Sequence, residues 1–145
     1  MKGPAPKFPQ EQTEESLSRI RRLCLCLPDT FEKLSHGEPT FFAGKKVFTM
    51  FANNHHNDGH LAVWLAAGPG VQENLTQTRP RVFFRPPYVG VCGWIGIELS
   101  QIEYEELGYY ILEGYRLIKS GKPVPRVEAP KAKAVKKKAA AKKRR

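Results

Sequence analysis

Residues 39–51, PTFFAGKKVFTMF, contain two runs of β-forming residues separated by a short turn. Phe, Val and Thr favour strands, and Gly44 tolerates the positive φ that a tight turn requires. The pattern predicts an antiparallel hairpin with strands at residues 39–42 and 47–51. A further short strand is expected just before it, at residues 32–37, so the hairpin belongs to a small meander.

The strand signals continue beyond the hairpin. Residues 53–59 read as a polar loop, and the apolar run HLAVWLA at residues 60–66 predicts a buried strand. Two more strands are predicted at residues 81–85 and 94–99, each bounded by Pro, Gly or a helix start. We therefore expect three or four strands, and then two more, in one antiparallel sheet.

Three segments around these strands predict helices. In residues 13–27 apolar side chains recur at every third or fourth position, with Thr13 as the expected N-cap. A short helix is predicted at residues 71–78. For the last helix, the sequence SQIE at residues 100–103 has the form of a capping box, and Gly121 is the expected stop.

The element order is helix, three or four strands, helix, two strands, helix. This order predicts an α+β domain of two layers, an antiparallel sheet with helices packed on one face. We expect this domain at residues 12–121, a Pro-rich arm at residues 1–11, and a Pro-spaced linker with a basic tail at residues 122–145.

The charge is divided unevenly along the chain of 145 residues. Residues 122–145 contain eleven basic residues and one acidic residue, which accounts for the whole net charge of +10. Residues 1–121 hold 13 basic and 13 acidic residues and are neutral. With 41% hydrophobic residues and three cysteines, the composition excludes a wholly disordered chain and a disulfide scaffold.

The basic tail is the strongest indication of function. Residues 131–145 contain only Lys, Arg, Ala and Val, so they cannot form a core and are expected to be disordered when free. Closely spaced cations bind a polyanion through counterion release, without reading its sequence. The alternatives are a solubility tail without a specific partner and contact with an anionic membrane surface. The membrane is the weaker of the two, because no Trp, Phe or Leu lies among the cations. The predicted nucleic-acid contacts here are Lys131, Lys133, Lys136, Lys137, Lys138, Lys142, Lys143, Arg144 and Arg145.

The predicted domain offers a smaller set of phosphate contacts at the hairpin turn and around the strand at residues 81–85. These candidates are Lys45, Lys46, Arg79, Arg81 and Arg85. The nearby aromatic residues Phe83, Tyr88 and Trp94 are candidates for stacking on exposed bases. The alternative is that the cations form a solvated face and the aromatic residues belong to the core.

The loop at residues 53–59 carries a candidate metal cluster, His55, His56 and Asp58, followed by His60. Zinc sites often include cysteine, and none of the three cysteines lies nearby in the sequence. A polar loop that happens to contain histidines explains the pattern equally well. We therefore predict no metal and no cofactor.

An enzymatic function has weak support. His36 and Glu38 form a candidate acid–base pair, with Tyr88 as a third group, but alternation along a strand places positions i and i+2 on one face whatever the function. Cys24 and Cys26 on a helix point about 200° apart, so they form neither a chelate nor a redox pair. We predict a protein that is not an enzyme.

Three ordered motifs give the chain a family resemblance: HGEPTFF at residues 36–42, RVFFRPPYVG at 81–90 and GWIGIEL at 93–99. They resemble the MmcQ/YjbR-like family, over roughly residues 14–119. The resemblance implies a small α+β domain of the CyaY-like or secretion-chaperone-like kind, and DNA binding through a double-wing motif. The tail lies outside it and resembles the lysine-rich tails of histone-like proteins.

These observations predict a non-catalytic protein that binds DNA largely independently of sequence, with RNA as the alternative polyanion. A protein-interaction or chaperone-like module that uses the open sheet face remains the alternative of a different class. The chain starts without a signal peptide and has an odd number of cysteines, which favours the cytoplasm, including association with the nucleoid.

Overall fold

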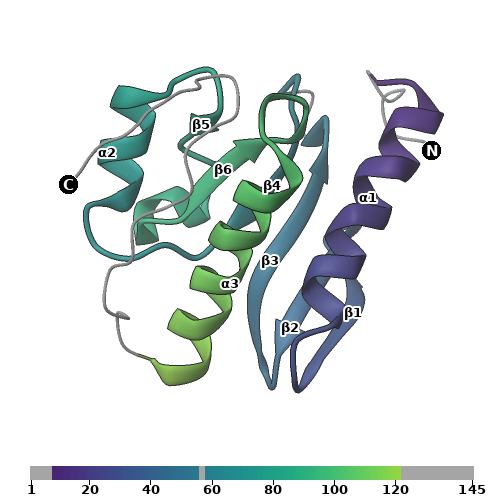
Figure 1. Ribbon diagram of the computed structural model, residues 1–145, viewed down its shortest axis with the longest axis vertical. Helices are drawn as coiled ribbons and strands as arrows, with labels where there is room; N and C mark the ends of the chain where they lie inside the picture. Colours follow the sequence, from purple (N-terminus) through teal and green to yellow (C-terminus); the bar gives the residue numbers. More distant parts are fainter. Residues whose placement is uncertain (1–7, 56–57, 122–145) are drawn as a thin grey trace.

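The computed structural model describes residues 8–55 and 58–121, so the predicted basic tail and most of the predicted arm lie outside the described residues. The described part contains three α-helices and a single sheet. Figure 1 shows how they are arranged. The elements are, in chain order, α1 (Gln10–Leu25), β1 (Thr30–Ser35), β2 (Glu38–Ala43), β3 (Lys46–Asn53), β4 (Leu61–Leu65), α2 (Val71–Thr78), β5 (Phe83–Phe84), the 3-10 helix η2 (Val89–Cys92), β6 (Ile95–Glu98), the 3-10 helix η3 (Leu99–Gln101) and α3 (Tyr104–Ser120).

The six described strands pair antiparallel in the order β1-β2-β3-β4-β6-β5. Strands that follow one another in the chain are neighbours as far as β4, after which β6 lies between β4 and β5. The sheet is therefore open, with β1 and β5 at its edges (Figure 1). This arrangement confirms the predicted α+β class and the antiparallel sheet.

The predicted hairpin is present as β2 and β3, and it contains a β-bulge. Phe41 pairs with Thr49, whereas the next residue, Phe42, pairs with Val47. Phe48 is therefore the extra residue on β3, and the bulge adds local twist to the hairpin. Its ring is fully buried, and it packs edge-on against a tyrosine of α3.

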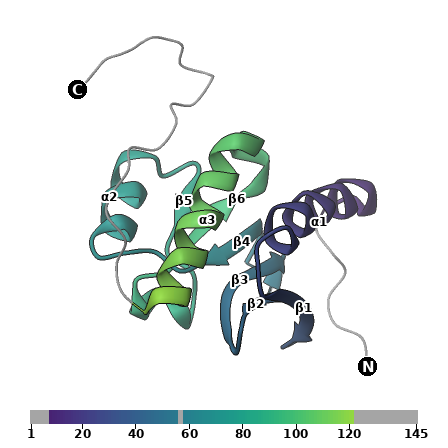
Figure 2. The same ribbon diagram turned by 60° about the horizontal axis from the view of Figure 1, so that its bottom comes forward.

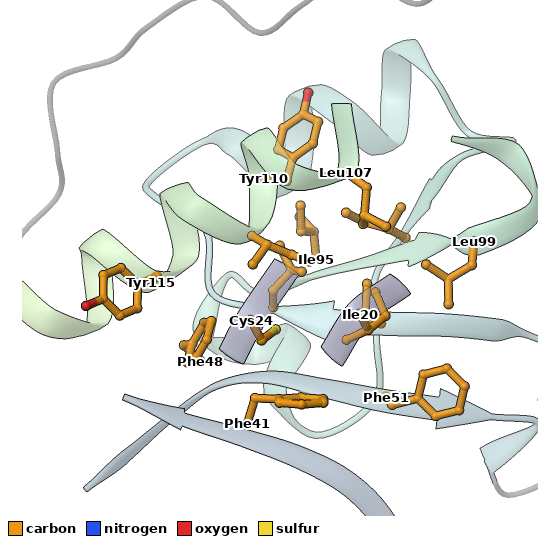
Figure 3. Packing of buried hydrophobic residues seen from close by; sticks show 14 of the residues in the cluster. Ile20, Cys24, Phe41, Phe48, Phe51, Ile95, Leu99, Leu107, Tyr110 and Tyr115 are labelled. Carbon is orange, nitrogen blue, oxygen red and sulfur yellow. The ribbon is translucent and has the colours of Figure 1, made fainter. Parts of the chain in front are cut away.

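Helices α1 and α3 lie across the same face of the sheet (Figure 1). Their apolar stripes meet the aromatic side chains of β2 and β3 beneath them, as Figure 3 shows. Helix α2 lies beside the β5 end of the sheet and adds Leu75 to the same core (Figure 2). The labelled core side chains are Ile20, Cys24, Phe41, Phe48, Phe51, Ile95, Leu99, Leu107, Tyr110 and Tyr115.

Two contacts fix the position of α3. Gly114 lies so close to the sheet that a Cβ atom there would come within 2.9 Å of the Ala66 carbonyl oxygen, so only glycine fits without a shift. One residue further on, the Tyr115 hydroxyl donates a hydrogen bond of 2.6 Å to the Pro28 carbonyl oxygen. Together they hold the C-terminal half of α3 against β4 and the α1–β1 connection.

The two long helices begin where the sequence did not predict. Residues 99–101 form a 3-10 turn and Ile102 is extended, so α3 starts only at Tyr104, and the predicted capping box is wrong. Ile102 packs against the core with extended backbone (φ −136°, ψ 144°), which interrupts the helical run ahead of Tyr104. At the other end, α1 begins at Gln10, and the Thr13 hydroxyl donates to the Pro9 carbonyl oxygen instead of capping.

Two further boundaries differ in how well they match the prediction. The end of α3 at Gly121 is confirmed, with φ +69° and an N–H donated to the Leu117 carbonyl oxygen. The predicted strand at residues 81–85 shrinks to two paired residues, because only Phe83 and Phe84 pair with β6.

Candidate functional site

The face of the sheet opposite α1 and α3 carries a row of cross-strand neighbours. Thr40 of β2 pairs with Met50 of β3, which in turn pairs with Trp64 of β4, and Trp64 pairs with Gly96 of β6. Since directly paired residues point to the same side, these side chains share the face without helices. The alternate positions, such as Phe51 of β3, point into the core.

A cavity lies above this row. Its volume of about 750 Å³ falls within the range of roughly 300–1,000 Å³ that is typical of small-molecule sites. Its lining is mostly apolar and aromatic, with histidines as the only titratable groups apart from a tyrosine hydroxyl. The lining residues are Ser35, His36, Thr40, Val47, Met50, His55, Trp64, Tyr88, Val89 and Trp94.

One wall of the cavity is the loop between β5 and β6. The loop contains a γ-turn, in which the Val89 N–H donates to the Pro87 carbonyl oxygen at 2.6 Å. Tyr88 stands at its centre with φ 63° and ψ −69°, a rare and strained conformation for a residue with a side chain. Such strain costs about 1–3 kcal/mol and is concentrated at functional sites. Tyr88 is 70% exposed, so burial of its ring does not explain the strain.

Helix α2 holds this loop in place. The Gln72 side-chain amide donates two hydrogen bonds, of 2.8 Å to the Gly90 carbonyl oxygen and 2.7 Å to the Trp94 carbonyl oxygen. The stem of Arg85 lies directly over Gly90, where a Cβ atom would come within 2.7 Å of the Arg85 Cγ. The part of the wall that follows Tyr88 is therefore tied to α2, and the Arg85 stem packs on it from the other end of the same loop.

Trp64 lies in the floor of the cavity with an unused hydrogen-bond donor. The residue is 2% exposed, and its indole Nε1 has no hydrogen-bond partner among the described residues. His55 packs edge-on against it, with 5.3 Å between ring centroids. The second tryptophan, Trp94, is half-buried in the opposite wall. Both tryptophans of the chain thus line this one cavity.

His55 of the cavity lining pairs with Glu38, which lies outside the lining. His55 Nδ1 lies 3.1 Å from Glu38 Oε2, with both side chains 13% exposed, and the Asn53 N–H also donates to this oxygen. Burial raises the pKa of Glu38 above its ordinary value, while the hydrogen bond from His55 acts in the opposite direction. Of the candidate acid–base pair His36 and Glu38, Glu38 pairs with His55, and His36 contacts the Ser35 hydroxyl at 3.1 Å.

Of the histidines in the candidate metal cluster, His56 lies outside the described residues, and His55 and His60 point to different partners. His55 pairs with Glu38, whereas His60 pairs with Glu98 of β6 and stacks on Phe84 at 3.9 Å between centroids. The two pairs fasten the two ends of the loop to different strands. Within residues 8–55 and 58–121, no three His, Cys, Asp or Glu side chains are grouped to hold a metal ion.

The predicted cations of the folded part do not form one surface. Lys45 and Lys46 are exposed at the β2–β3 turn, and Arg81 and Arg85 are exposed on either side of β5. Strands β4 and β6 lie between β3 and β5, so three strand spacings of about 4.8 Å place the two groups roughly 14 Å apart or more. Arg79 forms a two-pronged ion pair with the buried carboxylate of Glu106. The nine predicted tail contacts lie outside the described residues.

The structure also brings Arg79 next to two arginines that the sequence did not single out. Arg19 and Arg22 of α1 meet Arg79 around a hollow of about 540 Å³ near the start of α3. Arg19 pairs with Glu15 at 3.1 Å and Arg79 with Glu106, so Arg22 is the cation of the three that makes no ion pair within the described residues.

The candidate stacking residues divide between core and cavity. Phe83 is 1% exposed and packs in the core, whereas Tyr88 and Trp94 line the cavity. Sequence reasoning missed Trp64 and Met50. The run HLAVWLA is apolar throughout, so its alternation did not reveal which side chain faces away from the helices.

No helix among the described residues is both long and apolar enough to cross a bilayer. Comparison with curated proteins finds no significant match. Among solved structures, the chain is similar to the crystal structure of the Deinococcus radiodurans protein DR2400, which carries the domain DUF419. The TM-score is 0.59 at 20% identity, over 73% of this chain and 79% of that chain, so this similarity concerns the fold.

A comparison with family models matches the YjbR family over residues 25–117. The matched region runs from the end of α1 almost to the end of α3 and includes every strand of the sheet and the whole lining of the cavity. Because this match covers well over half of the sequence, the chain belongs to the YjbR family.

Proposed function

We propose that this protein binds DNA without catalysis and largely without sequence preference, through the phosphate backbone. The cations of residues 131–145 supply most of the affinity, and the folded YjbR domain acts as the scaffold that carries them. RNA is a second polyanion that the same contacts accept, because counterion release does not depend on the sugar. The proposal places the protein in the cytoplasm, with the nucleoid DNA as its partner.

The separation of charge along the chain carries this proposal. Residues 122–145 hold a net charge of +10, whereas residues 1–121 are neutral. The contacts in the folded part point the same way, because four of its cations are already paired with carboxylates. These pairs are Arg19–Glu15, Arg21–Glu32, Arg79–Glu106 and Lys119–Asp29.

The folded part contributes a limited number of phosphate contacts in this proposal. Lys45, Lys46, Arg81 and Arg85 are exposed and make no ion pair within the described residues, so they are available to a backbone that passes over the domain. We leave Arg79 out of the phosphate contacts, because its guanidinium is needed by the buried Glu106 carboxylate. Contacts of this kind position the domain and carry no sequence information.

The test compares the full chain with a chain that ends at Gly121, using duplexes of two unrelated sequences at one low salt concentration. We expect the shortened chain to lose most of the affinity, by more than about tenfold, and the full chain to bind both duplexes equally. A matched control keeps the length but replaces the nine cations of residues 131–145 with Gln. Undiminished binding by the shortened chain and by this control would contradict the proposal and move the site onto the folded domain.

One observation favours a second candidate function, protein interaction. The edge strand β1 exposes Leu34 at 70% and Phe31 at 44%, and an edge strand offers unpaired backbone groups to another strand. If β1 recruits an extended segment of a protein partner, Leu34→Lys abolishes that association and leaves DNA binding unchanged. Loss of DNA binding in this variant, with the fold intact, would instead assign β1 to the nucleic-acid surface.

A further inference from the structure

We propose that the cavity on the sheet face opposite α1 and α3 binds one unpaired nucleobase of a single-stranded region. This inference rests on the proposed function and adds a preference for unpaired bases to it. The base enters between the Tyr88 wall and the floor made by Met50 and Trp64. The sugar and phosphate remain outside, beside the exposed Arg85. The domain thus adds recognition of base exposure to the sequence-independent affinity of the tail.

The shape and chemistry of the lining favour a flat, uncharged ring. Tyr88, Trp94 and His36 provide aromatic surfaces around a space of about 750 Å³, which is large enough for a base. No carboxylate or ammonium group lines the cavity, so a charged ligand gains no ion pair inside it. Every base has a π-face, and stacking on aromatic side chains is the usual basis of single-strand binding.

The floor of the cavity contains a hydrogen-bond donor without an acceptor, so a ligand that carries an acceptor is favoured. The Trp64 indole N–H is buried and has no partner among the described residues, and a buried donor without an acceptor is unfavourable. Ring nitrogens and carbonyl oxygens on the edge of a base supply such an acceptor. A purely hydrocarbon ligand fills the space but leaves the donor unsatisfied, which is why we favour a heterocycle.

Tyr88 has the properties of a stacking residue. Its strained γ-turn holds the ring at the mouth of the cavity, although the side chain is 70% exposed and gains little from burial. The hydrogen bonds from Gln72 fix the loop before any ligand arrives. A stacking surface that is already in place loses little conformational entropy on binding.

Arg85 supplies the positive charge that would bind the phosphate of the nucleotide, because the cavity lining itself contains no such charge. It precedes Tyr88 by three residues on the same loop, is exposed, and makes no ion pair within the described residues. A cation beside an aromatic surface is the combination that single-strand sites use to hold backbone and base together. A base within a duplex cannot use this site unless it leaves the stack, because its faces are covered by its neighbours.

The experiment uses the full chain and its intrinsic tryptophan fluorescence, which reports on this cavity because both tryptophans line it. The ligands are an oligothymidylate of about 12 nucleotides, an abasic strand of the same length, a duplex, and free thymidine. We expect the oligothymidylate to bind about 5- to 150-fold more tightly than the abasic strand and to change the emission. The duplex and the abasic strand bind through the tail without that change, and free thymidine binds far more weakly.

Variants locate the effect. Tyr88→Ala removes the difference between the oligothymidylate and the abasic strand, whereas Tyr88→Phe keeps it, because the ring is retained. Tyr104→Ala is the matched control, since Tyr104 is a partly exposed tyrosine on α3 that lies outside the cavity lining. Trp64→Phe keeps an aromatic floor but removes the donor, and we expect it to weaken the preference about 2- to 10-fold.

Three other outcomes would overturn the inference, and they show whether the proposed function fails with it. Equal affinity for the oligothymidylate and the abasic strand, with unchanged emission, removes the base site while the proposed function stands. If free thymidine changes the emission as strongly and at the same concentration as the oligothymidylate, the occupant is a small molecule and not a strand. If no nucleic acid binds at all, the proposed function and the inference fail together.

Discussion

The guanidinium of Arg79 forms a two-pronged ion pair with the carboxylate of Glu106, which ties the residue after α2 to the buried side of α3. Glu106 is only 2% exposed, and Arg79 also lies over the Phe83 ring, 5.2 Å from its centroid. The hydrogen bond to Glu106 raises the pKa of Arg79, whose charge is therefore secure at any ordinary pH. The pair makes Arg79 a structural residue, although its sequence context suggested a phosphate contact.

Arg79→Ala is expected to destabilise the protein by about 3–5 kcal/mol, because it leaves the Glu106 carboxylate buried without its counter-charge. Arg81→Ala, two residues away and exposed, is expected to change stability by less than about 0.5 kcal/mol. Denaturant melts of the two variants make the comparison. Equal and small effects would show that Glu106 does not depend on Arg79.

The three thiols are expected to react in two classes. Cys26 and Cys92 are exposed, whereas Cys24, on the inner side of α1, is buried in the core, and burial raises the pKa of its thiol. An alkylating reagent at neutral pH therefore modifies two thiols quickly, and the third only after the protein unfolds. Mass spectrometry of the native and denatured protein counts them. Rapid modification of Cys24 in the native protein would contradict its placement in the core.

Two glycines of α3 provide a matched test of how this helix packs. Gly114→Ala is expected to destabilise by about 1–3 kcal/mol, because its Cβ would meet the Ala66 carbonyl oxygen at 2.9 Å. At Gly108 a Cβ would meet only the end of the Leu23 side chain, at 3.2 Å. Gly108→Ala is therefore expected to be neutral or stabilising, by up to about 1 kcal/mol, through its helix propensity. Thermal melts that rank the two variants in the opposite order would contradict the packing of α3 on β4.

The ionisation of Glu38 is expected to lower the free energy of unfolding as the pH rises. Its pKa is raised by burial, so the folded state binds the proton more tightly than the unfolded state. The contribution of protonated Glu38 to the free energy of unfolding is fully present below the ordinary carboxyl pKa of about 4.5. It is lost as the pH rises through the raised pKa of Glu38 in the folded protein. Compared with Glu38→Gln, which stays neutral, the wild-type protein is expected to lose stability progressively above about pH 4.5.

Paired urea melts of the wild-type protein and Glu38→Gln, at a series of pH values, check this prediction. The other groups that face Glu38, His55 and Asp58, are present in both proteins, so the difference reports the ionisation of Glu38 together with its hydrogen bond to His55. A difference that is constant with pH, or one that favours the wild-type protein as the pH rises, would contradict a buried carboxyl with a raised pKa.

The sequence predicted the elements of this fold better than their ends. The hairpin at residues 39–51 and the stop at Gly121 depend on local signals, strand propensity and a glycine at positive φ, and both are confirmed. The start of α3 depends on the core. Its predicted cap at Ser100 is absent because Ile102 packs against the core with extended backbone, so the helix starts only at Tyr104.

The cavity was beyond local reasoning, because its lining comes from segments far apart in the chain. Thr40, Met50 and Trp64 become neighbours only through the register of β2, β3 and β4, and the β-bulge at Phe48 shifts that register. The γ-turn at Tyr88 left no signal beyond two preceding prolines. The sequence also could not separate structural cations from exposed ones. Arg79 and Arg81 were both predicted as phosphate contacts, although only Arg79 pairs with a buried carboxylate.

The measurement that tests the proposed function most directly is the salt dependence of DNA binding by the full chain and by the chain ending at Gly121. With about six phosphates neutralised by the tail, log K of the full chain is expected to fall against log salt with a slope of roughly −5. The shortened chain, neutral by count, is expected to lose most of that slope. A slope near zero for the full chain, or an unchanged slope for the shortened one, would contradict binding through the cations of residues 131–145.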